Sequence, residues 1–130
     1  MVADGDGTRA KGRGGIGVPF ASARGVLHEG VGLVQLEGEV DLATAPAFKA
    51  DIEQLLADGY LDVVVDLTRV TFIDSTALGV LIGSVRRLRE RDGRLVLVAD
   101  GFAVMRPLTL TGLDRVFTIV ATREEAAEQF

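Results

Sequence analysis

The chain has 130 residues, a net charge of −5 and no cysteine, and a chain of this length can bury one ordinary core. Without cysteine it has no disulfide framework, no thiolate metal site and no cysteine nucleophile, which is compatible with a reducing compartment. Proteins bind nucleic acids mainly through lysine and arginine side chains that neutralise phosphate groups. The acidic balance and the lack of a basic stripe therefore argue against direct DNA or RNA binding.

The first segment, residues 1–19, is MVADGDGTRAKGRGGIGVP, which is rich in glycine and has no apolar periodicity. Ordering it would cost backbone entropy and bury nothing in return, so we expect a disordered tail at 1–19 and one domain at 20–130. It lacks the apolar core of a signal peptide, and no stretch approaches the roughly 20 apolar residues of a membrane span. We therefore expect a soluble, cytoplasmic protein without a membrane partner. Residues 12–17 match the dinucleotide pattern G-x-G-x-x-G, but no strand precedes them, so we expect no nucleotide there.

The domain begins with an apolar segment at about residues 26–36, which glycines interrupt. This pattern predicts a hairpin or a bent pair of strands at an edge of the sheet. The next segment predicts a helix that begins at Thr44, has Pro46 in its first turn and ends at residues 58–59. Its apolar face consists of Phe48, Ile52, Leu55 and Leu56.

The centre of the chain joins a buried strand to an amphipathic helix. Residues 63–67 are β-branched or apolar almost without interruption, which is typical of a central strand covered on both faces. From residue 78 the apolar period changes to that of a helix. The apolar stripe of this helix consists of Leu78, Leu81, Ile82, Val85 and Leu88. Between strand and helix stand Asp74, Ser75 and Thr76, whose side chains can accept from free N–H groups of the first turn, so we expect one of them to cap the helix.

The opposite face of this helix is smooth rather than charged. It comprises Thr76, Gly79, Val80, Gly83 and Arg87. Each glycine weakens a helix by roughly 1 kcal/mol relative to alanine. Two explanations fit: a neighbouring element of the same chain approaches closely, or a partner docks on this face beside a hydroxyl group at the helix start.

The remaining segments complete an alternation of strands and helices. We expect a turn at 91–93, a buried strand at 95–98, a helix at 102–110 ended by Gly112, a strand at 116–120, and a short helix at 123–130 with Ala126, Ala127 and Phe130 as contacts. Pro107 should lie in the first turn of its helix or kink it. The alternation predicts an α/β domain with a mixed, mostly parallel central sheet, flanking helices and right-handed crossovers. In such sheets function concentrates where loops leave the carboxyl ends of strands, and we place Ser75 in the loop that leaves the 63–67 strand.

Three motifs connect these segments with a known family. Residues 72–83 are FIDSTALGVLIG, residues 38–41 are GEVD, and residues 110–113 are LTGL. In this order and spacing they resemble the signature motifs of the bacterial anti-sigma factor antagonists, the soluble members of the STAS family (sulfate transporter and anti-sigma factor antagonist domains). The resemblance runs from about residue 26 to the C-terminus. The chain differs at Ala77, where the family usually has glycine.

The resemblance implies a function as well as a STAS fold. It implies that Ser75 is phosphorylated by a partner serine kinase that is also an anti-sigma factor, as part of partner switching in transcription regulation. The unphosphorylated chain would capture that kinase and release a sigma factor, and a serine phosphatase would restore the serine. Thr76 is the competing phosphorylation site, and the match at Asp41 implies a contact near the partner's bound nucleotide. The implied partner-binding residues are Asp41, Asp74, Ser75, Thr76, Gly79, Val80 and Gly83.

Three alternative functions are open. Related STAS domains regulate anion transporters, lipid-transport complexes and stress-sensing assemblies, although the intact D-S-T triplet in a free-standing chain favours the antagonists. A receiver-type phospho-aspartate module would use Asp66 or Asp74, but neither Lys11 nor Lys49 lies on the last strand. An enzyme of the Ser-His-Asp type would need His28, which lies in the predicted hairpin away from any hydroxyl motif. We therefore expect a binding module rather than an enzyme, with no cofactor and no metal.

Overall fold

The computed structural model describes residues 18–130, so residues 12–17 and most of the predicted tail lie outside the described part of the chain. A five-stranded sheet forms the centre, in the order β1-β2-β3-β4-β5. β1 (Ala21–His28) runs antiparallel to β2 (Val31–Val40), whereas the three other pairs of neighbouring strands are parallel. The predicted α/β class, with a mixed, mostly parallel sheet and a hairpin at its edge, is confirmed.

The hairpin is longer than the sequence pattern predicted. β1 already begins at Ala21, because pairing with the almost fully buried β2 holds it, and most of its own side chains are not buried. Gly30 has a φ of +80°, which a tight turn between the two strands requires. Gly38 has the same φ, and a β-carbon there would lie 2.6 Å from the Val18 carbonyl oxygen and 2.8 Å from that of Pro19. The last two residues of the predicted tail therefore lie against the domain at Gly38.

β3 (Asp62–Ile73) is the central strand, and it extends well beyond the predicted 63–67. Its first half is buried between β2 and β4, whereas its second half exposes some residues and buries Val70 and Ile73. β4 pairs with β3 only as far as Asp66, so the second half continues beside β2 alone. The extension carries the Asp-Ser-Thr triplet to the far carboxyl end of the sheet.

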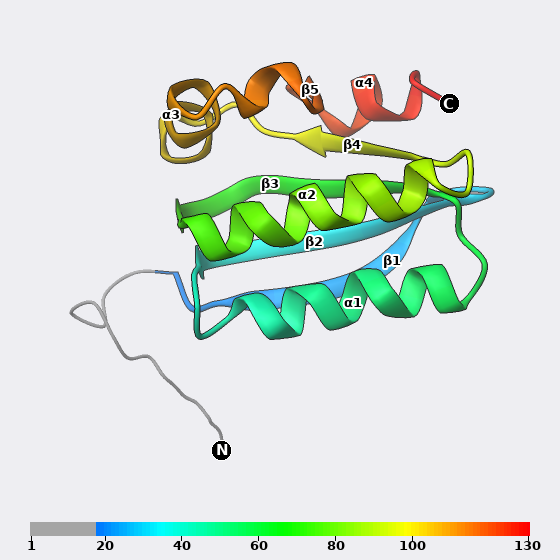
Figure 1. Ribbon diagram of the computed structural model, residues 1–130, viewed down its shortest axis with the longest axis horizontal. Helices are drawn as coiled ribbons and strands as arrows, with labels where there is room; N and C mark the ends of the chain where they lie inside the picture. The colour runs from blue at the N-terminus through cyan, green and yellow to red at the C-terminus, as the bar shows by residue number, and fades with distance from the viewer. Residues whose placement is uncertain (1–17) are drawn as a thin grey trace.

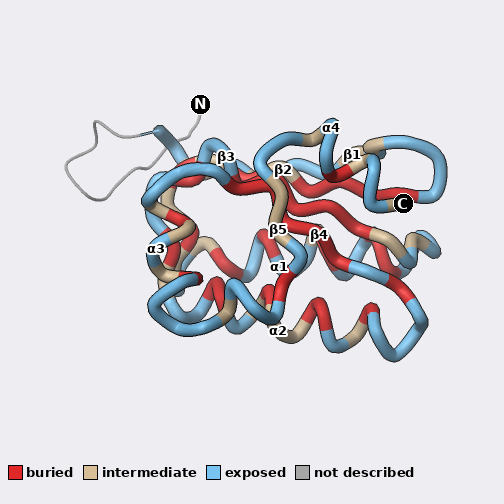
Figure 2. Tube along the Cα trace, turned by 90° about the horizontal axis from the view of Figure 1, so that it is seen from above, coloured by how far each residue is buried: buried red, intermediate tan, exposed pale blue. Residues whose placement is uncertain are grey.

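Two helices cover one face of the sheet, as Figure 1 shows: α1 (Ala45–Ala57) and α2 (Ser75–Arg89). Their apolar sides enclose the larger of two cores with the sheet. The smaller core lies on the opposite face, where α4 (Arg123–Ala127) contributes the fully buried Ala126. Figure 2 shows the buried residues concentrated in the strands and on the inner sides of the helices. On the outward side of α2, Ser75, Thr76 and Gly79 remain exposed.

The last third of the chain has the predicted order of elements; the helix at 102–110 has the predicted bounds, and the other elements differ by a few residues. β4 is Arg94–Val98, α3 is Phe102–Leu110, a short 3₁₀ helix spans Leu113–Arg115, and β5 is Thr118–Val120. Pro107 lies inside α3 rather than in its first turn. At that position the proline removes the N–H that would donate to the Ala103 carbonyl, so α3 lacks one intrahelical hydrogen bond. No helix within residues 18–130 is long and apolar enough to cross a membrane.

Candidate partner-binding site

Asp74 caps α2, as one residue of the triplet was predicted to do. Its backbone is extended, with φ −109° and ψ −177°, and the Ala77 amide N–H donates to its Oδ1 at 3.0 Å. Because β3 continues to Ile73, a single residue separates strand from helix. Ser75 is therefore the first residue of the helix, not part of a loop, and the predicted loop position is wrong. Both Ser75 and Thr76 are exposed.

The second carboxylate oxygen of Asp74 reaches another element. The Leu42 amide N–H donates to Asp74 Oδ2 at 3.0 Å, and the Asp74 N–H donates to the Val40 carbonyl at 3.2 Å. Leu42 lies in the connection between β2 and α1, 32 residues away along the chain. One side chain thus fixes the start of α2 and this connection relative to each other.

Asp41 occupies the same connection. Its Oδ1 accepts from the Ala43 amide at 3.0 Å and from the Thr44 amide at 3.1 Å. Thr44 lies just before α1, as predicted, but forms no capping bond with its own side chain; its Oγ1 instead accepts from the Asp41 amide at 2.9 Å. The carboxylate of Asp41 therefore organises the entry to α1. Through the bond between Leu42 and Asp74, the structure brings Asp41 to the same edge of the sheet as the Asp-Ser-Thr triplet.

The glycines of α2 lie on its outward side. Gly79 is exposed, and Gly83 and Val80 are half-buried. Apart from the adjacent residues and the backbone of α2 itself, a β-carbon added at Gly79 or Gly83 would meet no atom of residues 18–130 within 4 Å. A β-carbon at Gly93 would lie 1.9 Å from the Leu61 carbonyl oxygen. Close approach of a neighbouring element was one explanation for the helical glycines. Within the described part of the chain, packing gives no reason for them.

The buried face of α2 agrees with the predicted stripe except at its margins. Leu78, Leu81, Val85 and Leu88 are buried, but Ile82 is only half-buried and lies at the flank. Ala77 and Ser84 are also buried, and the Ser84 hydroxyl donates to the Val80 carbonyl at 2.7 Å. The methyl group of Ala77 thus points into the core. The departure from the family's glycine leaves the outward surface of the helix unchanged.

Asp66, the aspartate of the receiver-type alternative, is buried and held by hydrogen bonds that stabilise the fold. It is 4% exposed, its Oδ1 accepts from the Thr68 amide at 2.9 Å, and its Oδ2 accepts from Arg123 Nε at 2.6 Å. Burial raises the pKa of Asp66, but the hydrogen bonds from Thr68 and from Arg123 outweigh it, so the pKa lies below the ordinary 3.8. Oδ1 is therefore held within β3, and Oδ2 joins β3 to α4.

The other chemical groups considered from the sequence do not assemble into a site. His28 is exposed at the end of β1, and its ring meets that of Phe130 edge-on, with the centroids 6.4 Å apart. Among the residues that the structure describes, no three acidic or histidine side chains gather in a possible metal site. What the fold does gather is Asp41, Asp74, Ser75 and Thr76 at one edge, continuous with the outward side of α2.

Known proteins share this arrangement of strands and helices. Residues 25–126 match the model of the STAS domain. The anti-sigma-F factor antagonist RsfB of Mycobacterium tuberculosis is 33% identical over 99 residues, which are 76% of this chain and 80% of that protein. The crystal structure of an anti-sigma factor antagonist from Mycobacterium paratuberculosis has a TM-score of 0.78 at 34% identity, covering 85% of this chain and 93% of that one. Unphosphorylated SpoIIAA, at 24% identity and a TM-score of 0.67 over 84% of this chain and 96% of its own, shares the fold.

These comparisons confirm the resemblance carried by the three motifs. The matched region contains the GEVD, DSTALG and LTGL segments in one continuous span. The similar proteins are named as anti-sigma factor antagonists, a family of binding regulators. The chain belongs to the STAS domain family.

Proposed function

We propose that this chain is an anti-sigma factor antagonist that binds an anti-sigma factor kinase while Ser75 is unphosphorylated, so that a sigma factor is released. The observation that carries the proposal is the exposed Ser75 at the first position of α2, beside glycines that no internal packing explains. The names of the relatives support it over a role in a transporter or stress-sensing assembly. The chain acts by binding, without catalysis or a cofactor of its own, in the cytoplasm.

Phosphorylation acts at the interface rather than on the fold. A phosphate adds about 1.5–2 negative charges to Ser75. The N-terminus of α2 stabilises an anion by roughly 0.3–2 kcal/mol, and repulsion from Asp74 opposes this at close range. Asp74 remains held by the Ala77 and Leu42 amides, so the local structure tolerates the modification.

The partner surface responds more strongly than the fold does. A surface shaped for a small hydroxyl group must desolvate the phosphate, and a loss of only about 2.7 kcal/mol weakens binding roughly a hundredfold. In this proposal Asp74 positions Ser75 for the kinase, and Asp41 contacts the partner near its bound nucleotide. Gly79, Val80 and Gly83 form the smooth surface on which the partner lies, and a serine phosphatase reverses the modification.

Incubation with the candidate kinase and ATP, followed by intact-mass measurement, tests the proposal. The wild-type chain should gain one phosphate that maps to Ser75, and the Ser75→Ala variant should gain none. Thr76→Ala is the matched control and should be phosphorylated like wild type. Phosphate transfer that survives Ser75→Ala but is lost in Thr76→Ala would move the site by one residue. If no cognate kinase transferred phosphate to any of the three proteins, the proposed regulation by phosphorylation would be wrong.

A further inference from the structure

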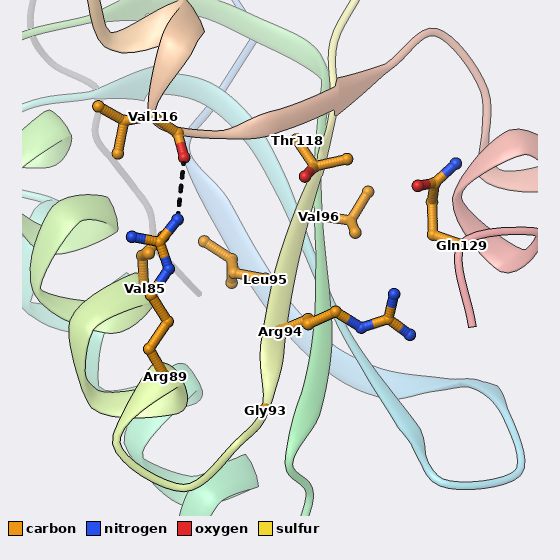
Figure 3. A pocket seen from close by; sticks show the side chains of 9 residues that line it. All are labelled: Val85, Arg89, Gly93, Arg94, Leu95, Val96, Val116, Thr118 and Gln129. Carbon is orange, nitrogen blue, oxygen red and sulfur yellow. Dashed lines mark hydrogen bonds between the residues drawn. The ribbon is translucent and has the colours of Figure 1, made fainter.

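A groove runs along the flank of α2 that faces β5. Its lining combines apolar and cationic side chains: Ile82, Val85, Arg86, Arg89, Glu90 and Val116. It continues into a hollow of about 210 Å³ that Val85, Leu95 and Val116 also line, and Figure 3 shows the Arg89 guanidinium reaching across this hollow. Of the residues that line the groove, only Ile82 belongs to the three STAS motifs, and none belongs to the triplet at the helix start.

The two arginines of the groove lack a carboxylate partner within residues 18–130, whereas their neighbour on the other flank has one. Arg87 points toward α1 and pairs with Glu53 at 3.1 Å. Within residues 18–130, neither Arg86 nor Arg89 forms an ion pair. The Arg89 Nη2 donates to the Val116 carbonyl at 3.4 Å, longer than an ordinary hydrogen bond of about 2.7–3.2 Å. A carboxylate would be a stronger acceptor for this guanidinium.

The groove is aligned with the proposed phosphorylation site. Ser75, Ile82 and Arg89 follow one another at intervals of seven residues, and two helical turns return a residue to within about 20° of the same direction. Gly79 and Arg86 lie at the intermediate positions of the same strip. A partner segment that covers Ser75 and continues along α2 therefore reaches Arg89, about 21 Å further on.

We propose that this groove binds an acidic segment of the partner protein that carries an apolar side chain. The apolar side chain lies against Ile82, Val85 and Val116, and a carboxylate replaces the long bond between Arg89 and Val116. The charge is complementary because the lining has two arginines and one glutamate, although the chain as a whole has a net charge of −5. The helix dipole favours cations at this end of α2, but it does not require them on the groove side. This inference rests on the proposed function and adds a second, phosphate-independent contact.

Distance separates this contact from the phosphorylation switch. Arg89 lies about 21 Å from Ser75 along the helix, which exceeds the screening length of about 8 Å in physiological salt. The groove should therefore contribute equally to the binding of the phosphorylated and unphosphorylated chains. Changing Arg89 should lower both affinities by the same factor and leave their ratio unchanged.

Titration calorimetry with the anti-sigma factor tests the groove against a matched charge reversal. Arg89→Glu should weaken binding of the unphosphorylated chain about tenfold. Arg91→Glu changes the net charge equally, in the exposed turn outside the groove, and should stay within about twofold of wild type. Thermal unfolding of both variants establishes that they fold. The proposed binding site would be contradicted if Arg89→Glu and wild type bound with equal affinity, or if both variants lost affinity by the same factor.

A probe that needs no partner separates the groove from the proposed function. An acetylated peptide of alternating leucine and glutamate is titrated into ¹⁵N-labelled protein, and the same peptide with lysine in place of glutamate is the control. The acidic peptide should cause saturable shifts at the amides of Ile82, Arg89 and Val116, and the basic peptide should not. Shifts that are absent, or the same with both peptides, would overturn the inference. A chain that binds the acidic peptide but no anti-sigma factor would contradict only the proposed function.

Discussion

The two sides of α2 are built according to different requirements. The inner side buries Leu81 and Leu88 completely and stabilises the domain through apolar burial. The outward side exposes Ser75 and Gly79, and a β-carbon at Gly79 or Gly83 would touch no other element within residues 18–130. In our proposal, stability and recognition are therefore separated by half a turn of the same helix. Substitutions on the inner side should change the free energy of unfolding, and those on the outer side should change binding.

The largest effect on stability should come from the inner side. Leu81→Ala removes a fully buried side chain from the larger core and should lower the free energy of unfolding by about 2–5 kcal/mol. Urea denaturation measures this loss. Arg86→Ala, on an exposed position of the same helix, should change stability by less than about 0.5 kcal/mol. A loss below about 1 kcal/mol for Leu81→Ala would mean that α2 does not depend on its inner side.

The ion pair between the buried Asp66 and the partly exposed Arg123 should have the next largest effect. Asp66→Asn weakens the bonds to Arg123 and Thr68 and should cost about 2–3 kcal/mol at neutral pH. Because the pKa of Asp66 is lower in the folded state than in the unfolded state, its stabilisation is present above about pH 4 and is lost as the pH falls through the folded-state value. Urea denaturation between pH 7 and pH 2.5 should therefore show wild type and Asp66→Asn converging at low pH. Asp114→Asn, at an exposed site, is the control; an Asp66→Asn difference that does not change with pH would contradict the assignment.

Glycine substitutions on the outward side of α2 should raise the stability of the fold, whereas substitution of Gly93, in the turn before β4, should lower it. Gly83→Ala should raise the free energy of unfolding by about 0.5–1 kcal/mol, since alanine favours a helix and the added methyl group has open space. Gly93→Ala should destabilise the fold strongly, because its β-carbon would clash with the Leu61 backbone. Gly83→Arg should fold but lose binding to the anti-sigma factor. Unfolding of Gly83→Arg would instead assign that glycine to packing.

The serine itself should matter least for stability. Asp74 rather than Ser75 accepts the capping bond, so Ser75→Ala should change the free energy of unfolding by less than about 0.5 kcal/mol. The variant should keep its affinity for the anti-sigma factor. Ser75→Glu should bind more weakly than wild type but more tightly than the phosphorylated chain, because it adds one charge rather than nearly two. Thermal unfolding combined with titration calorimetry separates the two effects, and a Ser75→Ala variant that folds but does not bind would show that the hydroxyl group itself is recognised.

The sequence pattern predicted the order and type of nearly every element but not the full length of the central strand. Residues 63–67 are recognisable because they are buried on both faces, and the pattern is continuous. Beyond Asp66, β2 is the only strand within residues 18–130 that pairs with β3. Isolated buried residues such as Val70 do not form a recognisable run. Ser75 lies at the helix start rather than in a loop because β3 continues through this second half, which the sequence pattern did not predict.

The candidate site could also be predicted only in part, because sequence patterns indicate local features but not contacts between distant segments. The triplet and the glycines are local features, and periodicity alone places them on one side of a helix. The bond from Leu42 to Asp74 joins residues 32 positions apart, and no local pattern indicates it. The groove at Arg89 depends equally on tertiary structure, since Val116 comes from a distant segment. Cysteine content, charge and periodicity carry no information about such pairs.

The most direct test of the central claim is the affinity of one anti-sigma factor for the unphosphorylated chain and for the same chain phosphorylated at Ser75. We expect phosphorylation to weaken binding at least about a hundredfold, which corresponds to about 2.7 kcal/mol, while the melting temperature stays nearly the same. Equal affinities for the two forms, or tighter binding of the phosphorylated form, would contradict it.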